Sequence, residues 1–378
     1  MKGFTTKALH TYYKPNNDDG AIIPPIHLST TFKFGNTGRY DYSRTVNPTR
    51  TILEQTLASL DHNTFGLAYS SGSAVLANVE ALLKKDETIL FSTDAYGGTY
   101  RFIVKVAGNQ GIKYKIVNLI DYTKTEEVLK KNNIKIIWVE TPTNPLLKIV
   151  DISRLSKLAK KYKSILVVDN TFASPVIQQP ARLGADIVAY STTKYINGHS
   201  DVIGGALTTS SKELYTKLKF LQNAIGAILS PFDSWLTLRG LRTLELRMER
   251  HIDNAEKIAE FLSKHKKIKT VYYPGLFTGE QKKIAEKQMK RPGGMLSIEI
   301  KEKYNVKKFL DTLKYFPLAE SLGGVESLID HPASMTHASI PKVEREKIGL
   351  SDGLLRISVG IENIEDLIDD LKQALEKV

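Results

Sequence analysis

The chain of 378 residues contains no cysteine. That absence excludes disulfide bonds, a thiolate nucleophile, iron–sulfur clusters and zinc sites with cysteine ligands. The eight histidines are scattered and form no H-E-x-x-H pair, so the sequence predicts no metal site. Apolar residues make up 42% of the chain, which is enough for a sizeable hydrophobic core without such cross-links.

Long apolar segments are also missing. No segment approaches the roughly 18 apolar residues that a membrane-spanning helix needs. The first residues, MKGFTTKALHTYY, lack the apolar run of a signal peptide. We therefore expect a soluble, cytoplasmic protein that makes no contact with a membrane.

The balance of charge is basic, with 53 Lys and Arg against 41 Asp and Glu and a formal net charge of +12. A surplus of this kind is found in proteins that bind nucleic acid. Most of these residues are lysines on predicted helix faces with carboxylates nearby, as in KTEEVLKK. We interpret the surplus as a solvated surface and predict no nucleic-acid partner. A basic nucleic-acid-binding or regulatory protein is the non-enzymatic alternative.

The motifs of the common nucleotide-binding and hydrolase folds are absent as well. The sequence has no G-x-G-x-x-G after a strand, no G-x-x-x-x-G-K-[ST] and no G-x-S-x-G. These absences exclude a dinucleotide fold of the usual type, a Walker-type loop and a nucleophile elbow. A different ligand must therefore occupy the strand ends of any α/β sheet in this chain.

Short apolar runs that alternate with helical segments dominate residues 50–235. Uninterrupted apolar runs of this length are typical of parallel strands buried on both faces, so we predict a mostly parallel sheet in an α/β fold. The predicted strands are FGLAY, TILFS, YKIVNL, IKIIWVE, SILVVD, DIVAYS and IGGALTT.

The rest of the chain suggests two further parts. Residues 1–48 carry Pro, Gly and Asn with little periodicity, which predicts an extended N-terminal arm. Residues 49–235 form the predicted large domain, and residues 236–378 form a smaller α+β domain. The pattern predicts one long amphipathic helix over residues 234–264.

Small residues follow the first predicted strand. Ser71, Gly72 and Ser73 come at the point where a helix begins, and backbone amides there favour a phosphate group. The alternative is an ordinary strand-to-helix turn with a serine cap.

Two charged residues end other predicted strands. Asp169 closes the strongly apolar strand ILVVD, where a carboxylate is costly unless it is paired, for example with a protonated ring nitrogen. Lys194 follows the strand DIVAYS, and burial there favours the neutral amine that a Schiff base needs. Ser191 and Thr193 flank it and place two hydroxyl groups near the same position. Considered alone, Asp169 has a structural salt bridge as its alternative, and Lys194 has an ordinary lysine whose amine lies in solvent.

A phosphate cradle, a carboxylate for a ring nitrogen and a strand-end lysine together match the needs of pyridoxal 5'-phosphate (PLP). Several longer segments resemble the signatures of the Cys/Met-metabolism family of PLP-dependent enzymes, and the resemblance runs from about residue 5 to the C-terminus. They are YSRTVNPT (42–49), DAYGGTYR (94–101), ETPTNP (140–145), STTKYINGHSD (191–201), AESLGGVES (319–327), MTHAS (335–339) and LRISVG (355–360). The resemblance implies the type I, aspartate-aminotransferase-like fold, with a mostly parallel seven-stranded sheet and PLP as cofactor.

The resemblance also implies roles for individual residues. In this family the lysine that matches Lys194 bonds covalently to the cofactor, Asp169 matches the partner of the ring nitrogen, and Tyr96 matches a tyrosine that stacks on the ring and transfers protons. The phosphate would lie against Ser71, Gly72, Ser73, Ser191 and Thr193.

Two residues of the arm match a pair that reaches the phosphate of a neighbouring subunit, namely Tyr42 and Arg44. The resemblance therefore implies a homotetramer built from two active-site dimers. Asn144, Ser321 and Arg356 match the groups that hold the carboxylate of a small amino-acid substrate. His199 and His337 are predicted to be structural rather than catalytic.

The reaction follows from details of the resemblance. Methionine γ-lyases carry a cysteine where this chain has Gly98, and cystathionine β-lyases usually carry a tryptophan near the position of Glu320. We expect Glu320 and Arg101 to bind the distal end of a long substrate. The prediction is γ-elimination on cystathionine, with γ-replacement (cystathionine γ-synthase) as the first alternative and a methionine γ-lyase as the next.

Overall fold

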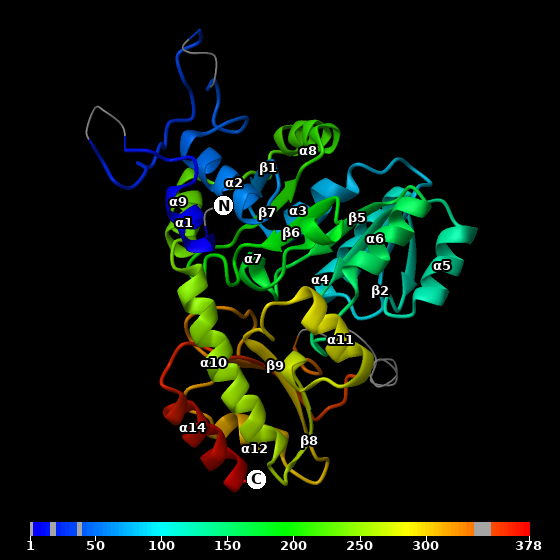
Figure 1. The fold of residues 1–378 in the computed structure, drawn as a ribbon, viewed down its shortest axis with the longest axis vertical. Helices are drawn as coiled ribbons and strands as arrows, with labels where there is room; N and C mark the ends of the chain where they lie inside the picture. Colours follow the sequence, from blue (N-terminus) through cyan, green and yellow to red (C-terminus); the bar gives the residue numbers. More distant parts are fainter. Residues whose placement is uncertain (1–2, 16–19, 36–39, 336–348) are drawn as a thin grey trace.

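The larger of two sheets contains the seven predicted strands, in the order β1-β7-β6-β5-β4-β2-β3. The computed structural model describes residues 3–15, 20–35, 40–335 and 349–378 (Figure 1). The strands are β1 (Phe65–Tyr69), β2 (Thr88–Ser92), β3 (Lys113–Val117), β4 (Ile134–Glu140), β5 (Ile165–Asp169), β6 (Ile187–Ser191) and β7 (Gly205–Thr209). The prediction of a mostly parallel seven-stranded sheet is confirmed.

Strand β7 runs against its neighbours β1 and β6, whereas β3, β2, β4, β5 and β6 pair in parallel. Parallel neighbours need a crossover, usually a helix. Residues 192–204 join β6 to β7 through turns and contain no helix, so the chain returns antiparallel. This short connection carries Lys194 and keeps it at the edge of the sheet.

Both faces of this sheet are covered, which explains why its strands are continuously apolar. On β4, Ile136 and Trp138 pack with α3 and α8, whereas Ile137 and Val139 pack on the other face with α5 and α6. The helices around the sheet are α2 (Pro48–Leu60), α3 (Gly72–Glu80), α4 (Gly97–Arg101), α5 (Tyr122–Lys131), α6 (Ile152–Lys161), α7 (Ser174–Ile177) and α8 (Lys212–Ile225).

The smaller sheet is antiparallel, in the order β10-β11-β9-β8. Figure 1 shows helix α10 running from the larger sheet to the smaller one, where it packs with α14. The elements are α10 (Leu244–Ser263), β8 (Ile268–Tyr272), α11 (Gly279–Gln288), β9 (Met295–Ile300), α12 (Val306–Thr312), β10 (Leu328–Asp330), β11 (Leu354–Ser358) and α14 (Ile364–Glu376).

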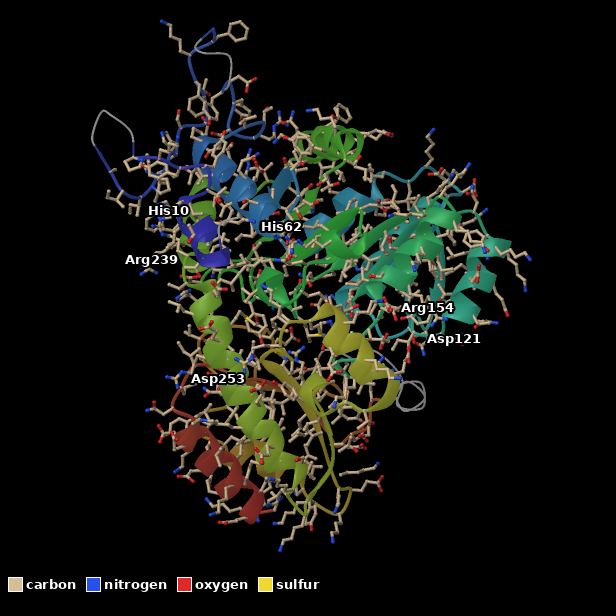
Figure 2. The ribbon with its side chains drawn as sticks, in the orientation of Figure 1. His10, His62, Asp121, Arg154, Arg239 and Asp253 are labelled. Carbon is tan, nitrogen blue, oxygen red and sulfur yellow. The ribbon has the colours of Figure 1, made fainter. Side chains whose placement is uncertain are left out.

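The prediction of one helix over residues 234–264 is wrong, because the segment forms α9 (Pro231–Leu241) and α10. The Gly240 carbonyl accepts from Thr243 N at 3.2 Å and from the guanidinium of Arg247 at 2.8 Å, and it therefore does not continue the α-helical ladder. Arg239 on α9 and Asp253 on α10 are both exposed (Figure 2). The amphipathic period alone did not reveal this break.

The N-terminal segment contains a helix that its composition did not predict, α1 (Phe4–His10). Its Ala8 is buried in the core cluster that also includes residues of α2. After this helix the described arm has little regular structure and leaves large apolar side chains in solvent, among them Ile22 (72% exposed), Leu28 (68%) and Phe34 (94%). Within the described ranges, no helix is both long and apolar enough to cross a membrane.

Candidate active site

A cavity of about 300 Å³ lies where the carboxyl ends of β4, β5 and β6 meet the start of α3 and residues of the smaller sheet. All predicted site residues except Tyr42, Arg44 and Arg101 line this cavity. Those that line it are Ser71, Gly72, Ser73, Tyr96, Asn144, Asp169, Ser191, Thr193, Lys194, Glu320, Ser321 and Arg356. Residues separated by more than 280 positions in the sequence thus share one site.

The turn before α3 lies very close to Ser191 at the end of β6. Ser71 is the N-cap of the helix, and its Oγ accepts a hydrogen bond of 3.0 Å from Ala74 N. A Cβ atom on Gly72 would lie 2.9 Å from the Cβ of Ser191, so only glycine lets the two segments touch. The serine-cap interpretation is therefore correct for Ser71, and Ser191 lies beside the start of the helix.

Asp169 ends β5 beside the cavity. Its Oδ1 accepts hydrogen bonds from the backbone N and Oγ1 of Thr171, at 3.0 and 2.5 Å. Thr171 Oγ1 in turn accepts from Ser191 N at 2.8 Å, and this contact joins the ends of β5 and β6. Burial raises the pKa of Asp169, against the opposing effect of the Thr171 hydrogen bonds.

Glu140 ends the neighbouring strand β4 and pairs in register with Asp169. Its side chain is only 7% exposed. Its two oxygens accept from Tyr96 N and Thr99 Oγ1, both at 2.8 Å. Burial, followed by the negative charge of Asp169, raises the pKa of Glu140.

Lys194 lies on the connection between β6 and β7 and points to the smaller sheet. Its Nζ donates a hydrogen bond of 2.7 Å to Ser321 Oγ. Burial and, next, the positive charge of Arg356 lower the pKa of Lys194 to about 8, although the charge of Glu320 opposes them. A substantial fraction of the neutral, nucleophilic amine is therefore present near pH 8.

Arg356 on β11 is a buried guanidinium with several partners. It donates to Asn144 Oδ1 at 3.0 Å and to the carbonyl oxygen of Ser321 at 2.9 Å. Asp330 on β10 lies opposite it and forms an ion pair of 3.5 Å. Asn144, Ser321 and Asp330 thus hold the guanidinium group of Arg356 in place at the cavity wall.

Tyr96 precedes α4 and remains 45% exposed beside the cavity. A Cβ atom on Gly98 would lie 2.4 Å from Cε1 of the Tyr96 ring. Any larger residue at position 98 therefore requires the ring to move.

Three predicted residues lie outside the cavity lining. Tyr42 and Arg44 belong to the arm, and the guanidinium carbon of Arg44 lies 5.6 Å from the centroid of the Tyr42 ring. Arg101 is the exposed last residue of α4. His199 contacts its own loop through Asn197 O at 2.7 Å, and His337 lies outside the described residues.

Sequence reasoning missed three residues of the site. Glu140 was part of a recognised segment but received no role, although an acidic residue at the end of an apolar strand is the signal that singled out Asp169. Thr171 connects two strand ends, and Asp330 pairs with Arg356. The contacts of Thr171 with Ser191 and of Asp330 with Arg356 have no local sequence signal, because each joins residues of different strands or strand ends.

Comparison with known proteins agrees with this arrangement. A cystathionine β-lyase of Lactococcus lactis subsp. cremoris is 50% identical over 380 residues, which cover 100% of both chains. A solved cystathionine γ-lyase of Lactobacillus plantarum, complexed with L-serine, matches with a TM-score of 0.97 at 42% identity, over 100% of this chain and 99% of that one. A solved cystathionine γ-synthase of Xanthomonas oryzae pv. oryzae, in complex with cystathionine, matches with a TM-score of 0.96 at 44% identity, over 100% and 98%.

The sequence pattern of one enzyme family matches residues 5–376, almost the whole length of the chain. The chain therefore belongs to the Cys/Met metabolism PLP-dependent enzyme family.

Proposed function

We propose that this enzyme cleaves cystathionine by γ-elimination, with PLP bound at Lys194. The observation that carries the proposal is the convergence of Lys194, Asp169 and Arg356 on one cavity. They provide a nucleophilic amine, a buried carboxylate and a guanidinium fork at the wall of a single site. In the overall reaction cystathionine and water give cysteine, 2-oxobutyrate and ammonia.

The residues of the cavity fit PLP. A buried carboxylate such as Asp169 is stabilised by a cationic partner, and a protonated pyridine nitrogen is one. The amides at the start of α3 and the hydroxyls of Ser191 and Thr193 suit a phosphate group, because the helix dipole favours an anion there. Lys194 would hold the cofactor covalently, since its pKa is lowered to about 8. Bound PLP would supply the electron sink for the charge that develops at the substrate Cα.

The protein's own groups then bind the substrate and move protons. Arg356 and Asn144 hold the α-carboxylate, and Ser321 supports both Arg356 and Lys194. Lys194 Nζ takes the proton from Cα, and a second proton then leaves Cβ, which allows the Cγ–S bond to break. Tyr96 gives a proton to the sulfur that leaves Cγ. Glu320, which also lines the cavity, faces the ammonium at the distal end of the substrate.

Two other reactions have specific support. The relative from Lactococcus lactis named a cystathionine β-lyase is 50% identical, which favours cleavage at Cβ to homocysteine and pyruvate. The structural neighbour named a γ-synthase holds cystathionine, which favours γ-replacement. Gly98 argues against a cysteine-bearing site of the methionine γ-lyase type, because a side chain there collides with the Tyr96 ring.

Product analysis separates these reactions. The purified holoenzyme is incubated with cystathionine, and the 2-oxo acid and the thiol are identified by chromatography. We expect 2-oxobutyrate and cysteine in equal amounts, and none from a Lys194→Ala preparation. Pyruvate and homocysteine as main products would show β-elimination instead. Formation of cystathionine from O-acylhomoserine and cysteine, at a higher kcat/KM than its cleavage, would show a synthase.

We also propose that the enzyme is a homotetramer whose active sites are shared between subunits. Tyr42 and Arg44 lie on the arm and do not line the cavity of their own chain. The arm exposes Ile22, Leu28 and Phe34, which a second subunit would cover. Tyr42 and Arg44 would then contact the cofactor phosphate in the active site of the neighbouring subunit.

A further inference from the structure

The side chain of Glu140 is a buried carboxyl at the cavity wall that the mechanism above does not use. It connects the end of β4 to the turn before α4, through Tyr96 N and Thr99 Oγ1. One donor is the backbone of Tyr96, whose ring lies at the cavity, and the other is Thr99, three residues further along the chain. We propose that Glu140 is a positioning residue, which fixes the turn that carries Tyr96 and so sets the place of the Tyr96 ring.

The surroundings of Glu140 make a purely structural role costly. The charged groups that act on it are Asp169 and Asp94, both negative, and burial adds a further penalty. Among the described residues, the two hydrogen bonds from the Tyr96 turn oppose these effects. A buried acid without a nearby cation costs stability, so an apolar or amide side chain would be a better choice for folding alone. Such groups are found preferentially at functional sites.

The turn that carries Tyr96 is stabilised by a side chain from another element. Helix α4 continues directly into a π-helical segment, Phe102–Ala107, whose Ile103 and Ala107 are buried, but Tyr96 at its N-cap makes no side-chain capping bond. Tyr96 is 45% exposed, so its ring is not fixed by burial. Gly98 leaves the ring free to lie against the backbone but does not hold it there. Glu140 therefore supplies two side-chain hydrogen bonds that connect this turn to the end of β4 in the central sheet.

Three substitutions separate the parts of this role. Glu140→Gln exchanges the carboxyl group for a neutral amide, which keeps one acceptor for Tyr96 N and offers a donor to Thr99 Oγ1. Glu140→Ala removes both hydrogen bonds. Glu80→Ala is the matched control, because Glu80 is also 7% exposed and also has its pKa raised by burial, but lies at the far end of α3 outside the cavity lining.

The expected results concern kcat and cofactor affinity of the holoenzyme. Glu140→Ala should lower kcat about 10- to 100-fold, the range for a lost hydrogen bond to a charged group, and should raise the Kd of PLP. Glu140→Gln should stay within about threefold of the wild type, since its geometry is retained. Glu80→Ala should leave kcat and the Kd of PLP unchanged. Equal effects of Glu140→Ala and Glu80→Ala would overturn the proposal.

A double-mutant cycle with Tyr96→Ala tests whether Glu140 acts through Tyr96. In the Tyr96→Ala background, Glu140→Ala should cause no further loss of kcat/KM. Multiplicative losses would show that Glu140 acts elsewhere, for example on Asp169, and would overturn the inference.

The inference rests on the proposed role of Tyr96, and the same cycle tests that role separately. If Tyr96→Ala leaves kcat/KM unchanged, the catalytic role of Tyr96 is wrong and the positioning role falls with it. If Tyr96→Ala is damaging but Glu140→Ala is not, the catalytic role stands and the positioning role alone is wrong.

Discussion

Lys194 Nζ and Ser321 Oγ are joined by a hydrogen bond of 2.7 Å, although 127 positions separate them in the chain. One residue belongs to the connection between β6 and β7, and the other lies between the elements of the smaller sheet. The backbone of Ser321 has φ of +87°, in the region that favours glycine. This backbone also directs the Ser321 carbonyl to Arg356. Ser321 thus connects the reactive amine with the carboxylate-binding group.

The positive φ of Ser321 predicts a difference in stability between two small substitutions. Ser321→Gly and Ser321→Ala both remove the hydroxyl group that accepts from Lys194, so both should raise the KM for cystathionine. Ser321→Gly should be more stable than Ser321→Ala by about 1 kcal/mol, because glycine tolerates the positive φ. Urea unfolding of the two variants measures this difference. Equal free energies of unfolding would contradict it.

The lowered pKa of Lys194 predicts how cofactor binding depends on pH. Only the neutral amine reacts, so the rate of PLP binding to the cofactor-free protein should rise with pH, with a midpoint at about 8. Arg356→Gln removes a positive neighbour and should move the midpoint to higher pH. Glu320→Gln removes a negative neighbour and should move it to lower pH. Stopped-flow absorbance at several pH values gives the midpoints, and shifts in the reverse directions would contradict the assignment.

The proposed sharing of active sites between subunits predicts complementation. Arg44→Ala should weaken cofactor binding, since it removes a charge-assisted contact to the phosphate of the neighbouring site. Lys194→Ala should be inactive. Mixed tetramers of the two variants should regain activity, because some sites then combine a wild-type Arg44 with a wild-type Lys194. If subunit exchange is demonstrated by mass spectrometry and activity does not return, the arm serves its own cavity.

The position of Glu320 at the cavity predicts an effect on substrate choice. Glu320→Ala should lower kcat/KM for cystathionine by about 10- to 100-fold, as expected for a lost charged contact, and should affect homocysteine much less. The sequence predicted a similar role for Arg101, but this residue lies outside the cavity lining, so we expect Arg101→Ala to have the smaller effect. Steady-state kinetics with both substrates measures the ratio. Equal losses on both would show that Glu320 supports the fold.

Much of the larger sheet could be predicted from the sequence, since each strand carries its own signal. The runs FGLAY, TILFS and IKIIWVE coincide with β1, β2 and β4 residue for residue. Burial on both faces demands side chains of one kind, so these runs are visible without knowledge of their neighbours. The break between α9 and α10 was not visible in this way. It depends on Arg247, whose partners include the carbonyl oxygens of Tyr195 and Gly240.

The sequence by itself determined the family, the strands and the residue types of the site, because these depend on short segments with strong local patterns. Only the tertiary structure brought Glu140 beside Asp169, Ser321 to Lys194 and Asp330 to Arg356. Each of these pairs joins different strands or sheets, and such pairing follows from strand order and packing rather than from spacing along the chain. Their electrostatic consequences, including the lowered pKa of Lys194, arise from burial, which exists only after the two parts of the chain have packed together.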